Sequence, residues 1–256
     1  MTHEFDNLPL IEVAIRMTLD SRLPADLAFI IDLYHQMQAE FPNVSDLPAI
    51  EVPPGAQAEW SFSPVPSTLG ARFANLKSNV SVLVQRDMLS VRWSRPATDP
   101  VQGMKSNYPR FTTGMVPALQ SLMTALDAIL GEDALRFSAA HMTYVNFLVS
   151  EEPLKAEALS RYIRGVPSGL YGDSTKFNAL DVSYGCEDGT DIRITVQSAN
   201  VAGAPGFLLA SSGGALLGTS SATETFHGLS RVHDALNKMF GDAITEDAAV
   251  EWKKSR

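Results

Sequence analysis

Cysteine is almost absent from this chain: Cys186 is the only one among 256 residues. A single thiol excludes an internal disulfide framework and a metal site built from several thiolates. The five histidines, at positions 3, 35, 141, 227 and 233, show no metal-ligand spacing. We therefore expect a reduced, cytoplasmic protein that holds no metal and no cofactor.

Long apolar runs and an excess of positive charge are also missing. No apolar run approaches the roughly 20 residues that a membrane-spanning helix needs, and residues 1–13 lack the basic-then-apolar order of a signal peptide. The formal net charge is −9, with acidic residues spread over the whole chain. Because such a surface repels phosphate groups, we expect neither a nucleic acid nor a membrane as partner.

Hydrophobic periodicity and turn residues predict a set of strands and helices in residues 1–132. They are a strand at 10–19, a helix between Pro24 and Pro42, an irregular stretch at 43–76 with one strand near 59–63, a hairpin of strands at 80–84 and 89–93, and a helix at 111–130 capped by Gly131. The alternation of apolar and polar residues at 10–19 is typical of a half-buried strand.

Residues 133–256 repeat this order. They are predicted to form a strand at 136–149, a helix from Pro153, strands at 180–184 and 192–196 joined at 187–189, a strand at 206–210, a small-residue loop at 211–221, a helix at 223–240, and a short helix from Thr245 to Trp252. The loop contains Ser211-Ser212-Gly213-Gly214, which would suit an anion at a helix N-terminus. It lacks the P-loop lysine, so a flexible loop is the better interpretation.

Each half thus has the order strand–helix–strand–strand–strand–helix. We predict an α+β fold of two duplicated β-α-β-β-β-α halves, residues 1–132 and 133–256. Their strands would form antiparallel sheet with the helices packed on one face. Such duplication is known in TATA-binding-protein-like and helix-grip folds, and the two halves side by side would make one continuous sheet. This likeness is one of topology, which does not fix a function.

Four short signatures follow one another along the chain. They are Pro9-Leu10-Ile11-Glu12-Val13; Leu83-Val84-Gln85 with Arg92-Trp93 and Tyr108-Pro109; Tyr144-Val145-Asn146; and His233 followed by Phe240, Ile244-Thr245 and Trp252. In these signatures the chain resembles a sporadically distributed bacterial family of about this length, whose function is unknown. That family usually has Arg two residues before the Tyr-x-Asn pattern, where this chain has Met142 beside His141. The resemblance supports the fold and implies no activity, but sporadic distribution suits mobile or defence-related gene clusters.

Strand alternation assigns a row of polar side chains to the sheet face that the helices leave open. The candidates for ligand or partner binding are Glu12, Arg16, Gln85, Arg92, Asp181 and Arg193, together with Tyr144 and Asn146, which share a face of another strand. Glu12 and Arg16 are too far apart on one strand to pair, so each needs a partner on a neighbouring strand. The alternative interpretation is an ordinary solvated face, as antiparallel sheets often have.

Asn146 and two further residues, His233 and Trp93, have a structural interpretation beside a functional one. Asn146 is unusual within a strand, so it either satisfies a buried group or contacts a ligand. His233 lies on an apolar helix stripe, which predicts a core histidine with satisfied hydrogen bonds. Trp93 is in phase with buried strand positions, which predicts a core residue.

The sequence favours a non-enzymatic binding or interaction protein. It would act through a protein partner or through self-association, by an edge strand or by the open sheet face. The alternative is a sensor or carrier of a small polar ligand, with a cavity between the curved sheet and the helices. Arg16, Arg92, Tyr144 and Asn146 would line that cavity.

An enzyme is the third alternative, and here it would be a hydrolase or transferase without a known signature. Such an enzyme needs titratable groups that converge. The available groups are Glu12, His141 and Asp181, and nothing in the sequence brings them together, so we assign no catalytic residue. The identity of the partner and the oligomeric state stay open at this point.

Overall fold

The computed structural model describes residues 9–24, 26–47, 70–96, 108–131, 134–152, 155–164, 179–186, 189–219 and 221–253. The strands in these residues are β1 (Leu10–Leu19), β2 (Asn43–Leu47), β3 (Gly70–Asn75), β4 (Val80–Val84), β5 (Met88–Ser94), β6 (Phe137–Val149), β7 (Ala179–Gly185), β8 (Thr190–Val201) and β9 (Ala204–Thr219). The helices are α1 (Leu27–Met37), the π-helical turn η1 (Phe111–Met115), which runs into α2 (Val116–Leu130), α3 (Ala156–Ser160), α4 (Ala222–Ala243) and α5 (Glu246–Lys253).

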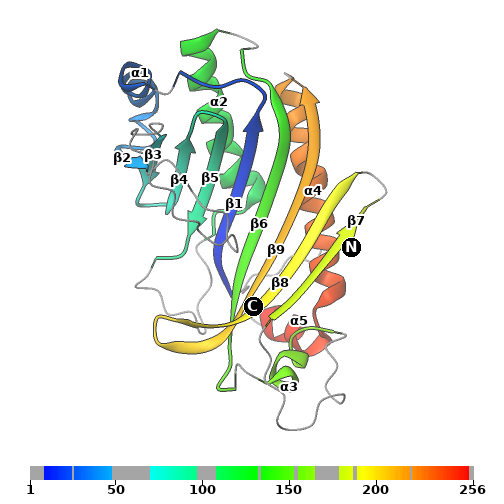
Figure 1. Ribbon diagram of the computed structural model, residues 1–256. Helices are drawn as coiled ribbons and strands as arrows, with labels where there is room; N and C mark the ends of the chain where they lie inside the picture. The colour runs from blue at the N-terminus through cyan, green and yellow to red at the C-terminus, as the bar shows by residue number, and fades with distance from the viewer. Residues whose placement is uncertain are drawn as a thin grey trace, which may run out of the picture.

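The fold is α+β, and its strands form one antiparallel sheet of nine strands (Figure 1). The strand order is β2-β3-β4-β5-β1-β6-β9-β8-β7. The first strands of the two predicted halves, β1 and β6, pair at the centre of the sheet, with Val13 opposite Tyr144 and Arg16 opposite His141. Both halves therefore contribute to a single continuous sheet.

Helices α2 and α4 run behind the sheet in Figure 1 and pack on the face that bears Val13, Ile15 and Met17. These three side chains are completely buried, and they alternate with more exposed residues along β1, as the periodicity predicts. We call the opposite side of the sheet the open face. Its residues on the strands from β5 to β7 include Ser90, Arg92, Glu12, Arg16, His141, Thr143, Ser212, Gly214, Asp191, Arg193, Gln197, Asp181 and Ser183.

Several predicted elements need correction. Residues 43–47 and 70–75, predicted to be irregular, form the strands β2 and β3, whereas the strand predicted near 59–63 lies outside the described residues. The first helix begins at Leu27 because Asp26 caps it: the Asp26 carboxylate accepts a 2.9 Å hydrogen bond from the Phe29 backbone N–H. The prediction from Pro24 was therefore three residues early.

The segment predicted as a loop at 211–221 belongs largely to β9, so that prediction was wrong. This stretch pairs with β6 on one side and with β8 on the other. Its glycines lie where neighbouring groups leave no room for a side chain. A Cβ atom at Gly213 would lie 3.0 Å from Val232 on α4, and one at Gly214 would lie 2.5 Å from His141 Nδ1. The small residues therefore permit close packing within a strand.

A second, smaller core forms where α3 and α5 meet the ends of β8 and β9. Its buried members include Leu159, Ile163, Phe207, Leu209, Ile244 and Trp252. Thr245 caps α5, since its hydroxyl accepts a hydrogen bond from Ala248 N–H at 3.2 Å and donates one to Arg161 O at 2.5 Å. Ile244-Thr245 and Trp252 of the last signature therefore hold the C-terminal helix against α3.

The combined helix Phe111–Leu130 is long and apolar enough, by length and composition alone, to cross a membrane. In the fold it packs against the sheet and α1, with Leu119, Leu122 and Leu126 completely buried. A core helix passes the same test of length and hydropathy. Gly131 ends it with a φ of 97°, as the sequence predicts.

Candidate functional site

Glu12 and Arg92 form an ion pair on the open face, between β1 and β5. The Glu12 Oε2 atom lies 2.6 Å from Arg92 Nη2, and the two side chains are 27% and 38% exposed. Arg92 lies opposite Ala14 in the β1–β5 ladder, so the carboxylate reaches it diagonally. The expectation that Glu12 pairs with a neighbouring strand is confirmed.

Arg16 lies between Ser90 of β5 and His141 of β6 in the same row of the sheet. The His141 ring lies over Gly214, the next position of that row. Partial desolvation of the imidazole ring lowers the pKa of His141, although the residue as a whole stays exposed, and the positive charge of Arg16 lowers this pKa further. His141 is therefore neutral at pH 7, and the arginine beside it favours this neutral form.

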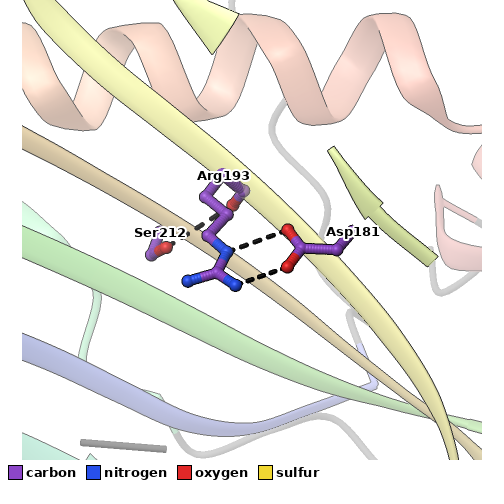
Figure 2. A network of polar contacts seen from close by, with 3 residues as sticks. All are labelled: Asp181, Arg193 and Ser212. Atoms are coloured by element: carbon purple, nitrogen blue, oxygen red, sulfur yellow. Dashed lines mark hydrogen bonds and ion pairs between the residues drawn. The ribbon is translucent and has the colours of Figure 1, made fainter. Parts of the chain in front are cut away.

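Asp181 and Arg193 form the second charged pair, four strands away from Glu12 at the far side of the sheet. Figure 2 shows the guanidinium of Arg193 facing the carboxylate of Asp181, with Nε 2.8 Å from Oδ1 and Nη2 bonded to Oδ2. Ser212 of β9 donates a long hydrogen bond, 3.5 Å, to the Arg193 carbonyl. The contact between the two groups lowers the pKa of Asp181 and raises that of Arg193. Bidentate contact fixes the orientation of both exposed side chains.

Exposure is unequal over the open face. At β4, Ser81 and Leu83 point to this face yet are only 2% exposed. From β6 to β7 the face is accessible, and we call this part the exposed half; its most exposed residues are His141, Asp181, Ser183, Asp191, Arg193, Gln197 and Leu216. Leu216, at the end of β9, is 84% exposed. The exposed half thus combines both signs of charge with an apolar side chain.

Tyr144 lies on the opposite, helix-covered face. It pairs with Val13 on β1, and its hydroxyl is hydrogen-bonded to His233 Nδ1 on α4 at 2.7 Å. The other ring nitrogen of His233 is 2.9 Å from Asn237 Nδ2. His233 is therefore the satisfied core histidine that the sequence predicts. Tyr144 cannot line one cavity with Arg16, because the sheet separates them.

Aromatic rings surround this hydrogen-bonded pair. Phe111 of η1 stacks on the His233 ring, with centroids 4.0 Å apart and planes 13° apart. Tyr108 meets Tyr144 edge-on at 6.5 Å and Trp93 at 5.4 Å. We call Trp93, Tyr108, Phe111, Tyr144 and His233 the aromatic cluster. Residues from the second, third and fourth signatures meet there, although the signatures are widely separated in the chain.

Burial controls the ionisation of the aromatic cluster. It raises the pKa of Tyr108 and, together with the neighbouring Tyr108, that of Tyr144. It lowers the pKa of His233, partly offset by the nearby carboxylate of Asp234. All three groups are consequently neutral at pH 7, which suits a cluster that ties β6 to α4.

Arg110, between Tyr108 and Phe111, has a strained backbone. Its φ of 66° and ψ of 157° lie in a region that is essentially restricted to glycine. The following residues form the π-helical turn η1, in which Gly114 lies directly against Pro109; a Cβ atom there would be 2.4 Å from the Pro109 Cβ. This unusual geometry places Phe111 over His233.

Asn146 and Gln85 complete the predicted set. Asn146 is 1% exposed, and its Oδ1 atom has no hydrogen-bond partner among the described residues. Gln85 follows β4 at the hairpin turn, where its backbone N–H donates to Met88 O at 2.9 Å. Its Nε2 atom is buried, also without a partner among the described residues. Asn146 follows Val145, which lies opposite Glu12, but it shares the helix-covered face with Tyr144 and so points away from the Glu12–Arg92 pair.

The groups considered for catalysis do not converge. Glu12 and His141 lie in rows four residues apart along β1 and β6, a separation of about 13 Å at strand rise. Asp181 is four strands from β1, about 19 Å at the usual strand spacing. Among the described residues, no group of three or more His, Cys, Asp or Glu side chains gathers to hold a metal ion.

Sequence reasoning missed Phe111, Arg110 and Asn237 as members of this environment. Only Asn237 carried a local signal, since it lies four residues after His233 and hence on the same helix face. Comparison of the chain with protein-family models and with curated proteins finds no match.

Proposed function

We propose that this chain is a non-enzymatic interaction protein that binds a protein partner through the exposed half of the open face. The observation that carries the proposal is the fixed arrangement of polar side chains on this surface. Asp181 makes a bidentate contact with Arg193, and the His141 ring packs against Gly214. Side chains that are ordered before binding lose less conformational entropy when a partner arrives.

The shape and charge of the surface favour a protein as partner. Small-molecule sites are concave and enclose most of their ligand, whereas the exposed half is a broad surface spread over four strands, β6, β9, β8 and β7. It carries Asp181 and Asp191 as well as Arg193, so it lacks the uniform positive charge that attracts nucleic acid. Leu216 adds the exposed apolar contact that protein interfaces use.

A small-ligand carrier has less support. Its cavity would lie between the sheet and the helices, where the large side chains of Phe73, Trp93 and Phe137 are completely buried and pack in the core. A partly open groove of about 450 Å³ exists elsewhere, and its lining comes from α1 and α2. It is lined by Gln36, Pro117, Gln120, Ser121, Thr124, Ala125 and Ala128.

We also propose that the two halves arose by duplication, in a TATA-binding-protein-like arrangement. The support is the strand order, which reads β3-β4-β5-β1 toward the centre in one half and β7-β8-β9-β6 in the other. In each half a helix follows the central strand and a longer helix follows the last strand. The first half has β2 in addition. The resemblance to a sporadic bacterial family adds the proposal of a cytoplasmic partner encoded in the same mobile or defence-related gene cluster.

A capture experiment with matched variants tests the proposed function. Three tagged chains are compared in lysate of the cells from which the protein comes. They are the wild type, the variant Arg193→Glu and a surface control, Lys238→Ala/Asp242→Ala, whose two positions are exposed on α4. We expect one protein to be retained by the wild type and by the control and to be lost from Arg193→Glu. Calorimetry with that protein after purification should give the same ranking, with equal affinity for the wild type and the control and weaker binding to Arg193→Glu. Equal retention by all three chains, or no retained protein, contradicts the proposal.

A further inference from the structure

Strand β7 forms one edge of the sheet, and among the described strands it pairs only with β8 (Figure 1). Along β7, Leu180, Val182 and Tyr184 point to the helix-covered face. Their neighbours on β8, which are Val196, Ile194 and Ile192, are at least 93% buried. Leu180 and Val182 are only partly buried and Tyr184 is 50% exposed. The apolar layer of the sheet therefore ends incompletely covered at this edge.

The hydrogen-bond pattern shows which backbone groups of β7 point outward. Cys186 N–H donates to Thr190 O at 2.8 Å, which makes these two residues a hydrogen-bonded pair at the hairpin end. In an antiparallel ladder, hydrogen-bonded pairs recur at every second residue. Tyr184, Val182 and Leu180 consequently bond to β8. The backbone N–H and C=O groups of Asp181 and Ser183 point away from β8, toward the edge.

We propose that β7 pairs antiparallel with β7 of a second copy of this chain, with Val182 opposite Val182 at the two-fold axis. In this register Leu180 of each copy lies opposite Tyr184 of the other, so the incompletely covered apolar row becomes continuous across the interface. Asp181 lies opposite Ser183, and these are the residues whose backbone groups are directed outward. The edge strand is thus complementary to itself in side chains and in hydrogen bonds, as an isologous interface requires.

Charge agrees with the same register. Ser183 lies beside Arg193 of β8 within one copy, and the pairing places Asp181 of the second copy on the other side of Ser183. Each interface therefore contains two rows in which an arginine and the partner's aspartate approach across a serine. The dimer uses the edge of the sheet, so this inference goes beyond the proposed partner-binding face.

Disulfide trapping tests the register. Cys186 is the only native cysteine, so its replacement leaves no competing thiol. In a Cys186→Ser background, Val182→Cys places two thiols opposite each other in a non-hydrogen-bonded pair, about 4.5 Å apart between Cα atoms, which a disulfide can span. The matched control Ser183→Cys, one residue along the same edge, faces Asp181 instead of itself and lies beyond disulfide reach. We expect a cross-linked dimer for Val182→Cys alone. Cross-linking of both variants, of neither, or of Ser183→Cys alone overturns the proposal.

Sedimentation of the unmodified chain tests the dimer without any cross-link. We expect twice the monomer mass at micromolar concentration, and a monomer for Ser183→Pro, which removes an outward N–H where proline is tolerated at an edge. Val182→Lys places two ammonium groups opposite each other at the two-fold axis and should also be a monomer. Ser183→Ala should stay dimeric. A monomeric wild type, or a dimeric Val182→Lys with an unchanged circular dichroism spectrum, overturns the proposal. Mass is the readout here and partner capture is the readout of the proposed function, so failure of one is distinguished from failure of the other.

Discussion

Tyr144 on β6 and His233 on α4 are 89 residues apart in the chain, and a 2.7 Å hydrogen bond joins the Tyr144 hydroxyl to His233 Nδ1. The bond crosses from the sheet to the helix that covers it. It lies inside the aromatic cluster, where water has little access and an unpaired polar atom is costly. The pair therefore fixes the position of α4 behind the exposed half of the open face.

Removing the Tyr144 hydroxyl should destabilise the fold. In Tyr144→Phe, one ring nitrogen of His233 keeps its burial and loses its partner, which costs about 1–3 kcal/mol. Urea unfolding followed by circular dichroism measures this loss. Tyr184→Phe is the control, because that side chain is 50% exposed and its hydroxyl should matter by less than about 0.5 kcal/mol. Equal stability of the two variants would contradict the role assigned to the Tyr144–His233 bond.

Stability should fall as the solution is acidified. The pKa values of His141 and His233 in the folded chain are lowered below 6.5, mainly by burial. The unfolded chain therefore binds more protons near that pH, so folding is favoured above about pH 6.5 and loses this contribution as the pH falls through the folded-state values. The free energy of unfolding, measured in urea from pH 7.5 to pH 5, should decrease. In the double variant His141→Ala/His233→Gln the slope should be smaller; an unchanged slope would assign the effect to other groups.

Gly214 and His141 should be energetically coupled. A Cβ atom at Gly214 would lie 2.5 Å from His141 Nδ1 and 2.6 Å from Cε1, so Gly214→Ala displaces the ring and should cost about 1–3 kcal/mol. Once His141→Ala has removed the ring, the same glycine substitution should cost much less. Gly185→Ala is the control, since its new methyl group meets nothing closer than 3.8 Å. A double-mutant cycle with no coupling energy would show that the ring does not occupy this position.

The strained backbone of Arg110 should be measurable by comparing two small replacements. Arg110→Ala and Arg110→Gly both remove the guanidinium group, but only glycine adopts a φ of 66° with a ψ of 157° without strain. We expect the glycine variant to be more stable than the alanine variant by about 1 kcal/mol or more in urea unfolding. If alanine is the more stable of the two, the conformation described for Arg110 is wrong.

Local periodicity predicted much of the sheet. Residues 10–19, 80–84 and 89–93 form strands as predicted because alternation records which side of a strand is buried. Periodicity failed to predict the second part of β9. Gly213 and Gly214 lie against α4 and β6, where a larger side chain would not fit, and no local pattern in the sequence reveals this packing. Strands β2 and β3 were missed in a segment where proline and polar residues obscured the alternation.

The candidate site was predicted in part for the same reason. The open-face positions of Glu12, Arg92 and Arg193 follow from alternation, and the structure adds their partners. Tyr144 belongs to the other face because the register of β6 against β1 places it opposite Val13. Register depends on pairing between distant segments, so the sequence of one strand does not contain it.

A native mass spectrum of the purified chain tests the central claim of a protein-binding, self-associating module most directly. The account predicts a species of twice 27.7 kDa that carries no additional small molecule. A species of 27.7 kDa at micromolar concentration would contradict self-association through β7. A reproducible extra mass of a few hundred daltons would contradict the interaction function and favour a carrier of a small ligand.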